Sequence, residues 1–225
     1  MAKKLLICGG LGQATNFAFA IQDANRLGQN EYVCHGLIND RDGLEEIEGF
    51  PVVGGLKDIP AFIKQGYYFI YTIFRADGQQ QRIELFESLA IPDDRLAIFV
   101  HPTAYVAPKV HLSPGCVVMP NASISSVTTI GRCCRILACS SIGHHNNIGN
   151  YCFFASNSCS GSYLEIEDGV TVGLNATIRE YVKLGKNSAV GMGAVVLNNI
   201  GPGEIWAGNP AKFLRNVHLT YTPEN

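Results

Sequence analysis

The second half of the chain carries an aliphatic or aromatic residue at every sixth position. Between residues 106 and 196, fifteen of the sixteen positions in this register are large and apolar, and only Ser160 interrupts the series. The apolar positions are Val106, Leu112, Val118, Ile124, Ile130, Ile136, Ile142, Ile148, Phe154, Ile166, Val172, Ile178, Leu184, Val190 and Val196. A period of six fits neither an α-helix nor the two-residue alternation of a lone strand. The pattern therefore predicts a parallel β-helix built from hexapeptides.

Mostly small or apolar residues form a second series, four positions after each residue of the first. Three hexapeptides, or about 18 residues, make one triangular coil. Cys116, Cys134 and Cys152 belong to the second series and follow one another at intervals of one coil, so we expect them to form one vertical ladder. A single coil cannot bury its apolar face, so the coils must stack. The period by itself does not fix the handedness of the coil.

The first 98 residues follow a different pattern, in which strands and helices alternate. We expect strands at residues 4–8, 32–38 and 69–73 and helices at residues 14–27 and 80–89. The first strand ends in a glycine-rich turn, Gly9-Gly10-Leu11-Gly12. These features predict a small, Rossmann-like parallel α/β unit in front of the β-helix.

The chain therefore divides into three predicted parts. Residues 1–98 form the α/β unit, residues 99–215 form the β-helix with a C-terminal cap, and residues 216–225, including the segment from Thr220 to Asn225, form a loose tail. A net charge of −2 argues against a nucleic-acid-binding surface, and the N-terminus lacks the pattern of a signal peptide. We expect a soluble cytoplasmic protein whose eight cysteines are structural core residues rather than a metal site or a disulfide set.

The glycine-rich turn is the first candidate binding element. Free N–H groups at a helix N-terminus attract phosphate. A Gly-x-x-Gly fragment alone is weak evidence, because a tight turn explains it equally well. Asn39 and Asp40 follow the second strand, at the position where nucleotide-binding α/β units bind a ribose or a base.

Four elements together resemble one family. They are the HPTA element at residues 101–104, the hexapeptide series, the GNPAK segment at residues 208–212 and the N-terminal glycine-turn unit. The chain resembles bacterial hexapeptide-repeat sugar acyltransferases of the bacillosamine N-acetyltransferase and sialic acid O-acetyltransferase type. The resemblance implies a left-handed β-helix, a homotrimer, acetyl-CoA as donor, and a nucleotide-linked amino sugar bound by the N-terminal domain.

Acyl transfer from a thioester requires a group that accepts the proton of the attacking amine, and histidine is the usual choice. His144 lies at a predicted turn, where packing gives no reason for a histidine, and it aligns with a His-acid-x-x-Ile-Gly element of the family. The next residue departs from the family, because His145 stands where relatives carry an acid. We expect Asn146 or Asn147 to be able to supply the missing hydrogen bond. A solvated turn histidine is the alternative.

The resemblance also suggests binding residues. For the nucleotide sugar these are Leu11, Gly12, Gln13, Asn39, Asp40, Ile73 and Phe74. For acetyl-CoA they are Phe153, Gly161, Ser162, Leu174, Met192 and Lys212. Phe153 stands where bacillosamine-type relatives have another histidine. Gly161 and Ser162 follow the interruption at Ser160, and we expect an irregular stretch there that offers a backbone N–H to the developing oxyanion.

These observations predict an acetyl-CoA-dependent N-acetyltransferase acting on a UDP- or dTDP-linked 4-amino-4,6-dideoxy sugar, without a metal. O-acetylation of a sialic-acid-like sugar and a non-catalytic β-helix scaffold are the alternatives. A carbonic anhydrase on this type of coil needs three histidines across a subunit interface, and no third histidine lies one coil away from His144 and His145. Cys133, Cys139 or Cys159 as an acyl carrier is a further alternative, which direct attack of the sugar on the thioester makes unnecessary.

Overall fold

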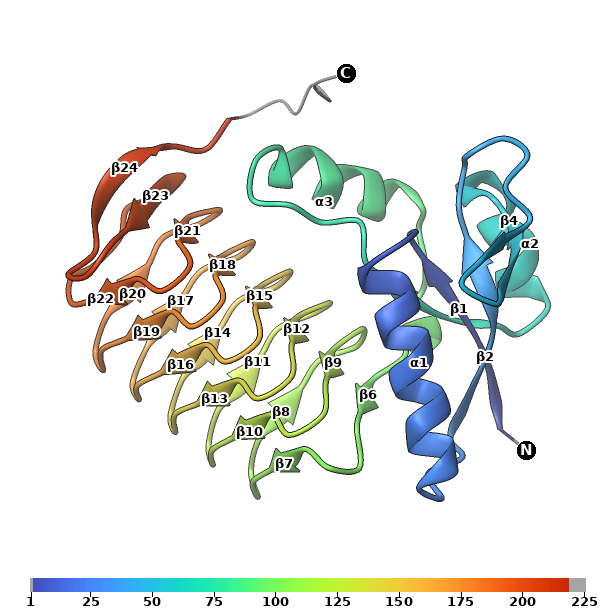
Figure 1. The fold of residues 1–225 in the computed structure, drawn as a ribbon, viewed down its shortest axis with the longest axis horizontal. Coiled ribbons are helices and arrows are strands. Elements are labelled where there is room, and N and C mark those ends of the chain that lie inside the picture. Colours follow the sequence, from blue (N-terminus) through green and yellow to red (C-terminus); the bar gives the residue numbers. More distant parts are fainter. Residues whose placement is uncertain (1, 219–225) are drawn as a thin grey trace.

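The computed structural model describes residues 2–218, in which a small α/β unit lies against a long β-helix (Figure 1). The sheet of the α/β unit has the order β3-β4-β2-β1-β5. Its strands are β1 (Lys3–Cys8), β2 (Tyr32–Ile38), β3 (Glu46–Ile47), β4 (Phe50–Gly54) and β5 (Tyr68–Tyr71). Its helices are α1 (Gln13–Arg26), α2 (Ile59–Lys64) and α3 (Gln79–Ser88), with 3₁₀ turns at Leu56–Asp58 and Asp93–Arg95. Strands β4, β2, β1 and β5 run parallel.

The strands and the two long helices expected from the sequence are confirmed to within a few residues. The β3–β4 hairpin and α2 were not expected. The hairpin strands are short, and Pro51 in β4, which pairs with the edge strand β3, weakens the sequence signal for a strand. Helix α2 has only six residues and begins Ile59-Pro60. So short a segment gives no helical period.

The predicted β-helix is confirmed as three sheets of two-residue parallel strands that stack along the coil, and two longer strands, β23 and β24, end the third sheet. The first sheet holds β7 (Tyr105–Val106), β10 (Ser123–Ile124), β13 (Ser141–Ile142), β16 (Cys159–Ser160), β19 (Thr177–Ile178) and β22 (Val195–Val196). The second holds β8 (His111–Leu112), β11 (Thr129–Ile130), β14 (Asn147–Ile148), β17 (Glu165–Ile166) and β20 (Lys183–Leu184). The third holds β6 (Phe99–Val100), β9 (Val117–Val118), β12 (Arg135–Ile136), β15 (Phe153–Phe154), β18 (Thr171–Val172), β21 (Ala189–Val190), β23 (Glu204–Ala207) and β24 (Lys212–Asn216).

Both residue series of the repeat point into the coil. The large apolar residues form its central core, and Cys116, Cys134 and Cys152 form the expected ladder beside them. Each of these buried thiols donates a hydrogen bond to the backbone of the next coil, at Gly131 O, Gly149 O and Glu167 O, over 3.0, 3.1 and 3.2 Å. All eight cysteines are free thiols. The cysteines of the ladder are therefore packing residues that also tie the coils together.

The irregular stretch expected at Ser160 is absent from the coil, and this prediction was wrong. Strand β16 pairs in register with β13 and β19, and Ser160 is buried like the apolar residues around it. Its hydroxyl accepts a hydrogen bond from the buried Asn146 side chain. A pair of polar side chains therefore takes the place of one apolar contact without shifting the backbone.

The corners of the coil repeat with the same period. From residue 109 to residue 193, every sixth residue has a positive φ. These residues are Lys109, Gly115, Asn121, Val127, Cys133, Cys139, His145, Tyr151, Asn157, Tyr163, Gly169, Asn175, Tyr181, Asn187 and Gly193. A residue in the left-handed region of φ and ψ bends the chain sharply between two strands. These sharp corners fit the left-handed β-helix that the resemblance implies.

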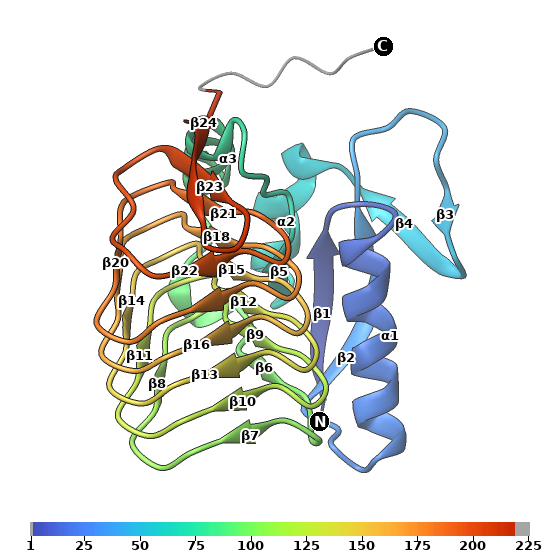
Figure 2. The same cartoon turned by 60° about the vertical axis from the view of Figure 1, so that its left-hand side comes forward.

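The α/β unit covers the third sheet of the coil. Val117 and Met119 pack into one of its apolar clusters with β1 and α1, and Cys133 and Tyr151 pack into another with α3. Figure 2 shows the unit on the side of the coil away from β8, β11 and β14. At the other end, β23 and β24 form an antiparallel hairpin that extends the third sheet.

Within residues 2–218, no helix is long and apolar enough to cross a membrane. The tail segment from Thr220 to Asn225 lies outside the described residues.

Candidate functional site

His144 and His145 lie on the corner that joins the first sheet to the second, directly after β13. Both side chains are exposed. The residue before them must be glycine, because a Cβ atom on Gly143 would lie 2.3 Å from Gly161 O of the next coil. His145 adopts φ 55°, which turns the chain so that the two imidazoles face each other. Their Nδ1 atoms are 3.0 Å apart.

The ring of His145 is held by a column of aromatic residues one and two coils further along. It stacks on Tyr163, with ring centres 5.1 Å apart and planes 26° apart. Tyr163 in turn stacks on Tyr181 at 5.1 Å and 5°. The ring of His144 meets the edge of Tyr163 at 5.3 Å. The one-coil spacing of these side chains places them in a single column, which fixes His145 beside His144.

The prediction that Asn146 or Asn147 supplies a hydrogen bond to His144 was wrong. Asn146 is buried, and its amide nitrogen donates to Gly143 O and Gly161 O while its oxygen accepts from the Leu164 N–H. Asn147 donates to Glu165 at 3.2 Å. Both asparagines bind neighbouring coils, and the group that contacts His144 Nδ1 is the imidazole of His145. If His144 Nδ1 carries the proton and donates to His145, then His144 Nε2 is left as a free base.

A second candidate region lies where the α/β unit meets the third sheet, and we call it the seam. It holds two adjoining cavities of about 370 and 320 Å³ that share Gln13, Phe74 and Arg75. The first is lined by Gly9, Gly10, Leu11, Gln13, Ala14, Thr72, Ile73, Phe74, Arg75 and Arg82. The second is lined by Gln13, Phe74, Arg75, Ala76, Arg135, Phe153 and Thr171.

The first cavity opens at the carboxyl ends of β1 and β5 and beside the start of α1. Gly9 cannot be replaced there without a clash, because a Cβ atom would lie 2.1 Å from Thr72 Oγ1, which itself donates to Cys8 O. The turn is followed by the first N–H groups of α1, and the first turn of this helix contains no acidic residue. This arrangement suits an anionic ligand.

The residues predicted to bind a nucleotide sugar fall into two groups. Leu11, Gln13, Ile73 and Phe74 line the first cavity, beside Gly12 at the start of α1. Asn39 and Asp40 do not line either cavity. The Asn39 amide donates to Gly9 O at 3.0 Å and so braces the glycine turn, whereas Asp40 accepts from the Leu56 N–H at 2.7 Å and braces the 3₁₀ turn after β4.

The residues predicted to bind acetyl-CoA are spread over the coil. Gly161 and Ser162 lie beside His144, whose backbone N–H donates to Ser162 Oγ at 3.1 Å. Leu174 and Met192 are exposed one coil apart on the corner that joins the third sheet to the first, Lys212 is exposed in β24, and Phe153 lines the seam. One chain does not bring these residues together. The N–H of Gly161 donates to Ile178 O at 2.8 Å, so the coil already uses one of the backbone N–H groups predicted for the oxyanion.

Sequence reasoning missed Arg135, Tyr163 and Tyr181. The tyrosines follow His145 at intervals of one coil, so the coil period could have found them. Arg135 occupies the outward position next to an apolar plug, where the sequence pattern predicts only a surface residue. Its burial depends on the α/β unit packed over it, which no local pattern reveals.

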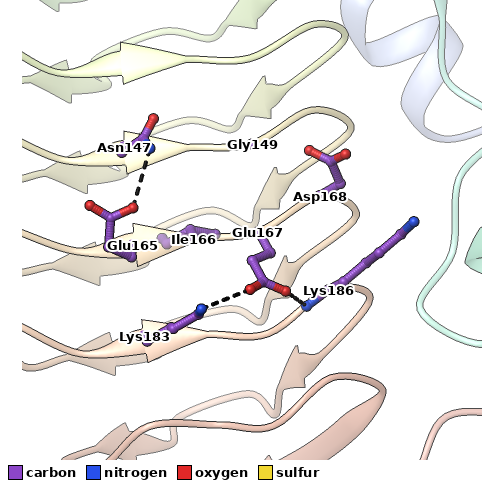
Figure 3. A pocket seen from close by; sticks show the side chains of 8 residues that line it. All are labelled: Asn147, Gly149, Glu165, Ile166, Glu167, Asp168, Lys183 and Lys186. Carbon is purple, nitrogen blue, oxygen red and sulfur yellow. Dashed lines mark hydrogen bonds and ion pairs between the residues drawn. The ribbon is translucent and has the colours of Figure 1, made fainter.

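A third hollow lies on the second sheet and is drawn in Figure 3. It contains one ion pair, in which Lys183 lies 3.0 Å from Glu167, and Glu167 also accepts from the backbone N–H of Lys186. These contacts, the hydrogen bond from Lys183 first, lower the pKa of Glu167. Glu165 and Asp168 accept hydrogen bonds from Asn147 and Asn150, so the three carboxylates of this hollow all have partners within the coil.

Across residues 2–218 there is no group of three or more His, Cys, Asp or Glu side chains placed to hold a metal ion. Burial raises the pKa of the Cys133 thiol. A thiolate is therefore disfavoured at this position, and Cys133 is a poor acyl carrier.

Solved structures similar to this chain include sugar acetyltransferases. A histidine-to-asparagine variant of perosamine N-acetyltransferase from Caulobacter crescentus, solved with CoA and GDP-perosamine, is 23% identical, with a TM-score of 0.80 over 96% of this chain and 99% of that chain. The acetyltransferase domain of PglB from Neisseria gonorrhoeae FA1090 is 22% identical, with a TM-score of 0.79 over 94% and 100%. WeeI from Acinetobacter baumannii AYE is 23% identical, with a TM-score of 0.76 over 95% and 100%.

No family model matches the sequence, and the search of curated proteins finds no match. The resemblance to hexapeptide-repeat sugar acetyltransferases is confirmed in the fold, which the neighbours share over nearly the whole chain.

Proposed function

We propose that this protein transfers an acetyl group from acetyl-CoA to the amino group of a nucleotide-linked 4-amino-4,6-dideoxy sugar. The observation that carries the proposal is the seam, a partly enclosed polar site beside a glycine turn, in a fold shared with such enzymes. The perosamine N-acetyltransferase of Caulobacter crescentus was solved with CoA and GDP-perosamine, and the PglB domain with acetyl-CoA. The activity named for the perosamine enzyme supports N-acetylation over O-acetylation.

The reaction is direct attack of the sugar amine on the thioester carbonyl. A C–N bond forms, the C–S bond breaks, and CoA leaves as the thiolate. His144 Nε2 accepts the proton that the amine loses, and the thiolate is protonated afterwards. His145 holds the other side of the His144 ring through the contact between their Nδ1 atoms. His145 is thus a positioning residue, and Tyr163 and Tyr181 keep its ring in place.

The catalytic histidine and the sugar site are separated within one chain. The seam lies on the third sheet, whereas His144 lies on the corner between the other two sheets, at the opposite side of the prism. A second chain is needed to bring the corner that carries His144 and His145, here called the histidine corner, to the seam of another chain. This separation supports the homotrimer expected from the sequence, with acetyl-CoA bound between neighbouring coils and His144 of one chain facing the sugar of another.

The activity is tested by measuring CoA release with UDP-, dTDP- and GDP-linked 4-amino sugars, followed by mass spectrometry of the product. We expect acetylation of at least one of these sugars at nitrogen, and acetyl-CoA should raise the melting temperature. The sequence resemblance favours UDP or dTDP, and the solved neighbour with GDP-perosamine adds GDP to the screen. Transfer only to the hydroxyl of a sialic-acid-like sugar, or no binding of acetyl-CoA, would contradict the proposal.

A further inference from the structure

The seam contains a fully buried arginine without an acidic partner. Arg135 is 2% exposed, and among residues 2–218 no carboxylate forms an ion pair with it. Its Nη1 donates to Gln13 Oε1 at 2.9 Å, and its Nε has no hydrogen-bond partner. Burial lowers the pKa of Arg135 to about 10, so the side chain is still protonated at neutral pH.

Two aromatic rings hold the guanidinium in place. Its carbon lies 4.5 Å from the ring centre of Phe74, in the α/β unit, and 4.8 Å from that of Phe153, in the coil. Aromatic faces offset part of the loss of water around a cation. They leave the Nε donor unsatisfied and the charge without an anionic partner, and a buried unpaired charge is costly. A bound anion would offset that cost.

The position of Arg135 indicates which kind of anion would bind beside it. Arg135 lines the second cavity, Gln13 lines both cavities, and the glycine turn and the start of α1 line the first. A ligand that spans both cavities and carries two adjacent phosphates would place one at the glycine turn and the other beside Arg135. Guanidinium groups match phosphate oxygens well, because their N–H groups lie in one plane.

We propose that Arg135 binds the second, sugar-side phosphate of a nucleoside diphosphate sugar, and that Gln13 orients the guanidinium for this contact. The inference rests on the proposed function for the sugar, but its test does not require acetyl transfer. It assigns a residue of the coil to nucleotide recognition and so makes the diphosphate a bridge between the α/β unit and the β-helix.

The test measures binding of UDP, dTDP and GDP and of their monophosphates to the full-length protein and to Arg135→Met by calorimetry. Methionine is an unbranched side chain without a charge. We expect the affinity for the preferred diphosphate to fall about ten- to a hundredfold, the worth of one or two charge-assisted hydrogen bonds. The affinity for the monophosphate should change much less, because its only phosphate lies at the glycine turn.

Arg132→Met is the matched control. Arg132 precedes Arg135 on the same coil and pairs with Glu87 at 2.8 Å and Asp93 at 2.7 Å. Its loss should lower the melting temperature of the ligand-free protein and leave diphosphate binding unchanged. Arg135→Met should keep or raise the ligand-free melting temperature, because it removes an unpaired buried charge. A purely structural role for Arg135 predicts the opposite, a lower melting temperature.

Three results would overturn the proposal. They are equal diphosphate affinity in wild type and Arg135→Met, an equal loss for monophosphate and diphosphate, and no binding of any of the three diphosphates to the wild type. A different result separates the two proposals: diphosphate binding that depends on Arg135, together with no acetyl transfer to any amino sugar, would refute the proposed function and leave this inference intact.

Discussion

The histidine corner and the seam differ in almost every physical respect. His144 and His145 are exposed, stand on a rigid turn and contact only the coil itself. Arg135 is buried between two parts of the chain that are 122 residues apart at its contact with Gln13. One region presents two imidazoles to any molecule that reaches the surface, and the other offers an enclosed cationic site.

This difference follows from the structure of the β-helix. A β-helix repeats the same corner in every coil, so it can hold a reactive side chain rigidly but cannot enclose a ligand by itself. Enclosure needs a second body, which the α/β unit provides at the third sheet. The predictions below test whether chemistry belongs to the corner and recognition to the seam.

The largest effect is expected at the corner. His144→Asn removes the base and should lower kcat by about two to four powers of ten, the usual worth of positioned acid–base catalysis. Binding of the nucleoside diphosphate at the seam should not change, because His144 of the neighbouring chain is proposed to face the sugar and not the phosphates. Steady-state kinetics and calorimetry on the same preparation check both parts. Near wild-type kcat would show that another group accepts the proton.

A mixed oligomer provides the control for the separation. Chains with His144→Asn and chains with Arg135→Met, each weak alone, should form active sites when they are expressed together, because an intact corner can then face an intact seam. Activity well above the sum of the two pure variants would support a site shared between chains. Activity equal to that sum would contradict it.

A smaller effect is expected at His145, whose proposed role is to position the ring of His144. His145→Ala should lower kcat about tenfold and leave KM unchanged, because the orienting contact at 3.0 Å is lost. His145→Asp should restore or raise kcat, since a carboxylate accepts from Nδ1–H and raises the basicity of the ring. Aspartate also tolerates the φ of 55° at this position better than most residues. A pH profile of kcat distinguishes the role: with aspartate, the limb that reports the histidine should shift to higher pH.

The coil could be predicted from the sequence because every contact in it is periodic. Each apolar plug meets its equivalent one coil away, so a local pattern specifies a long-range pairing such as that of Ile124 with Ile142. The same rule places Tyr163 and Tyr181 in the column of His145. The position of His144 on an outward corner also followed from the register.

The seam could not be predicted in this way, because it forms between two unrelated surfaces. The sequence identified Gln13 and Phe74 in the α/β unit, but not Arg135, which meets them only after the unit docks. The prediction that Asn146 contacts His144 was wrong for a related reason. A polar side chain inside the coil binds backbone groups of the coil, here Gly143 O and Gly161 O, and is then not available to a side chain on the surface.

The smallest effect concerns an ion pair at the edge of the seam. Asp77, next to Ala76 of the second cavity, accepts from Arg215 of β24 through both carboxylate oxygens at 3.0 and 2.8 Å, and from the His218 N–H. The hydrogen bond with Arg215 is the main reason that the pKa of Asp77 falls from 3.8 to about 2.

A lowered carboxyl pKa stabilises the folded state above the unfolded pKa, and this contribution disappears as the pH falls through the folded pKa. Because Arg215 is 41% exposed, water screens the pair and we expect it to contribute only about 1 kcal/mol at neutral pH.

Asp77→Asn should therefore lower the free energy of unfolding by about that amount at pH 7. The gap between variant and wild type should close between about pH 4 and pH 2. Urea unfolding at a series of pH values measures this gap, and a gap that persists at the acid end of the series would show that Asp77 acts through its shape rather than its charge. His144→Asn, far from this pair, should show the same pH dependence of stability as the wild type over that range.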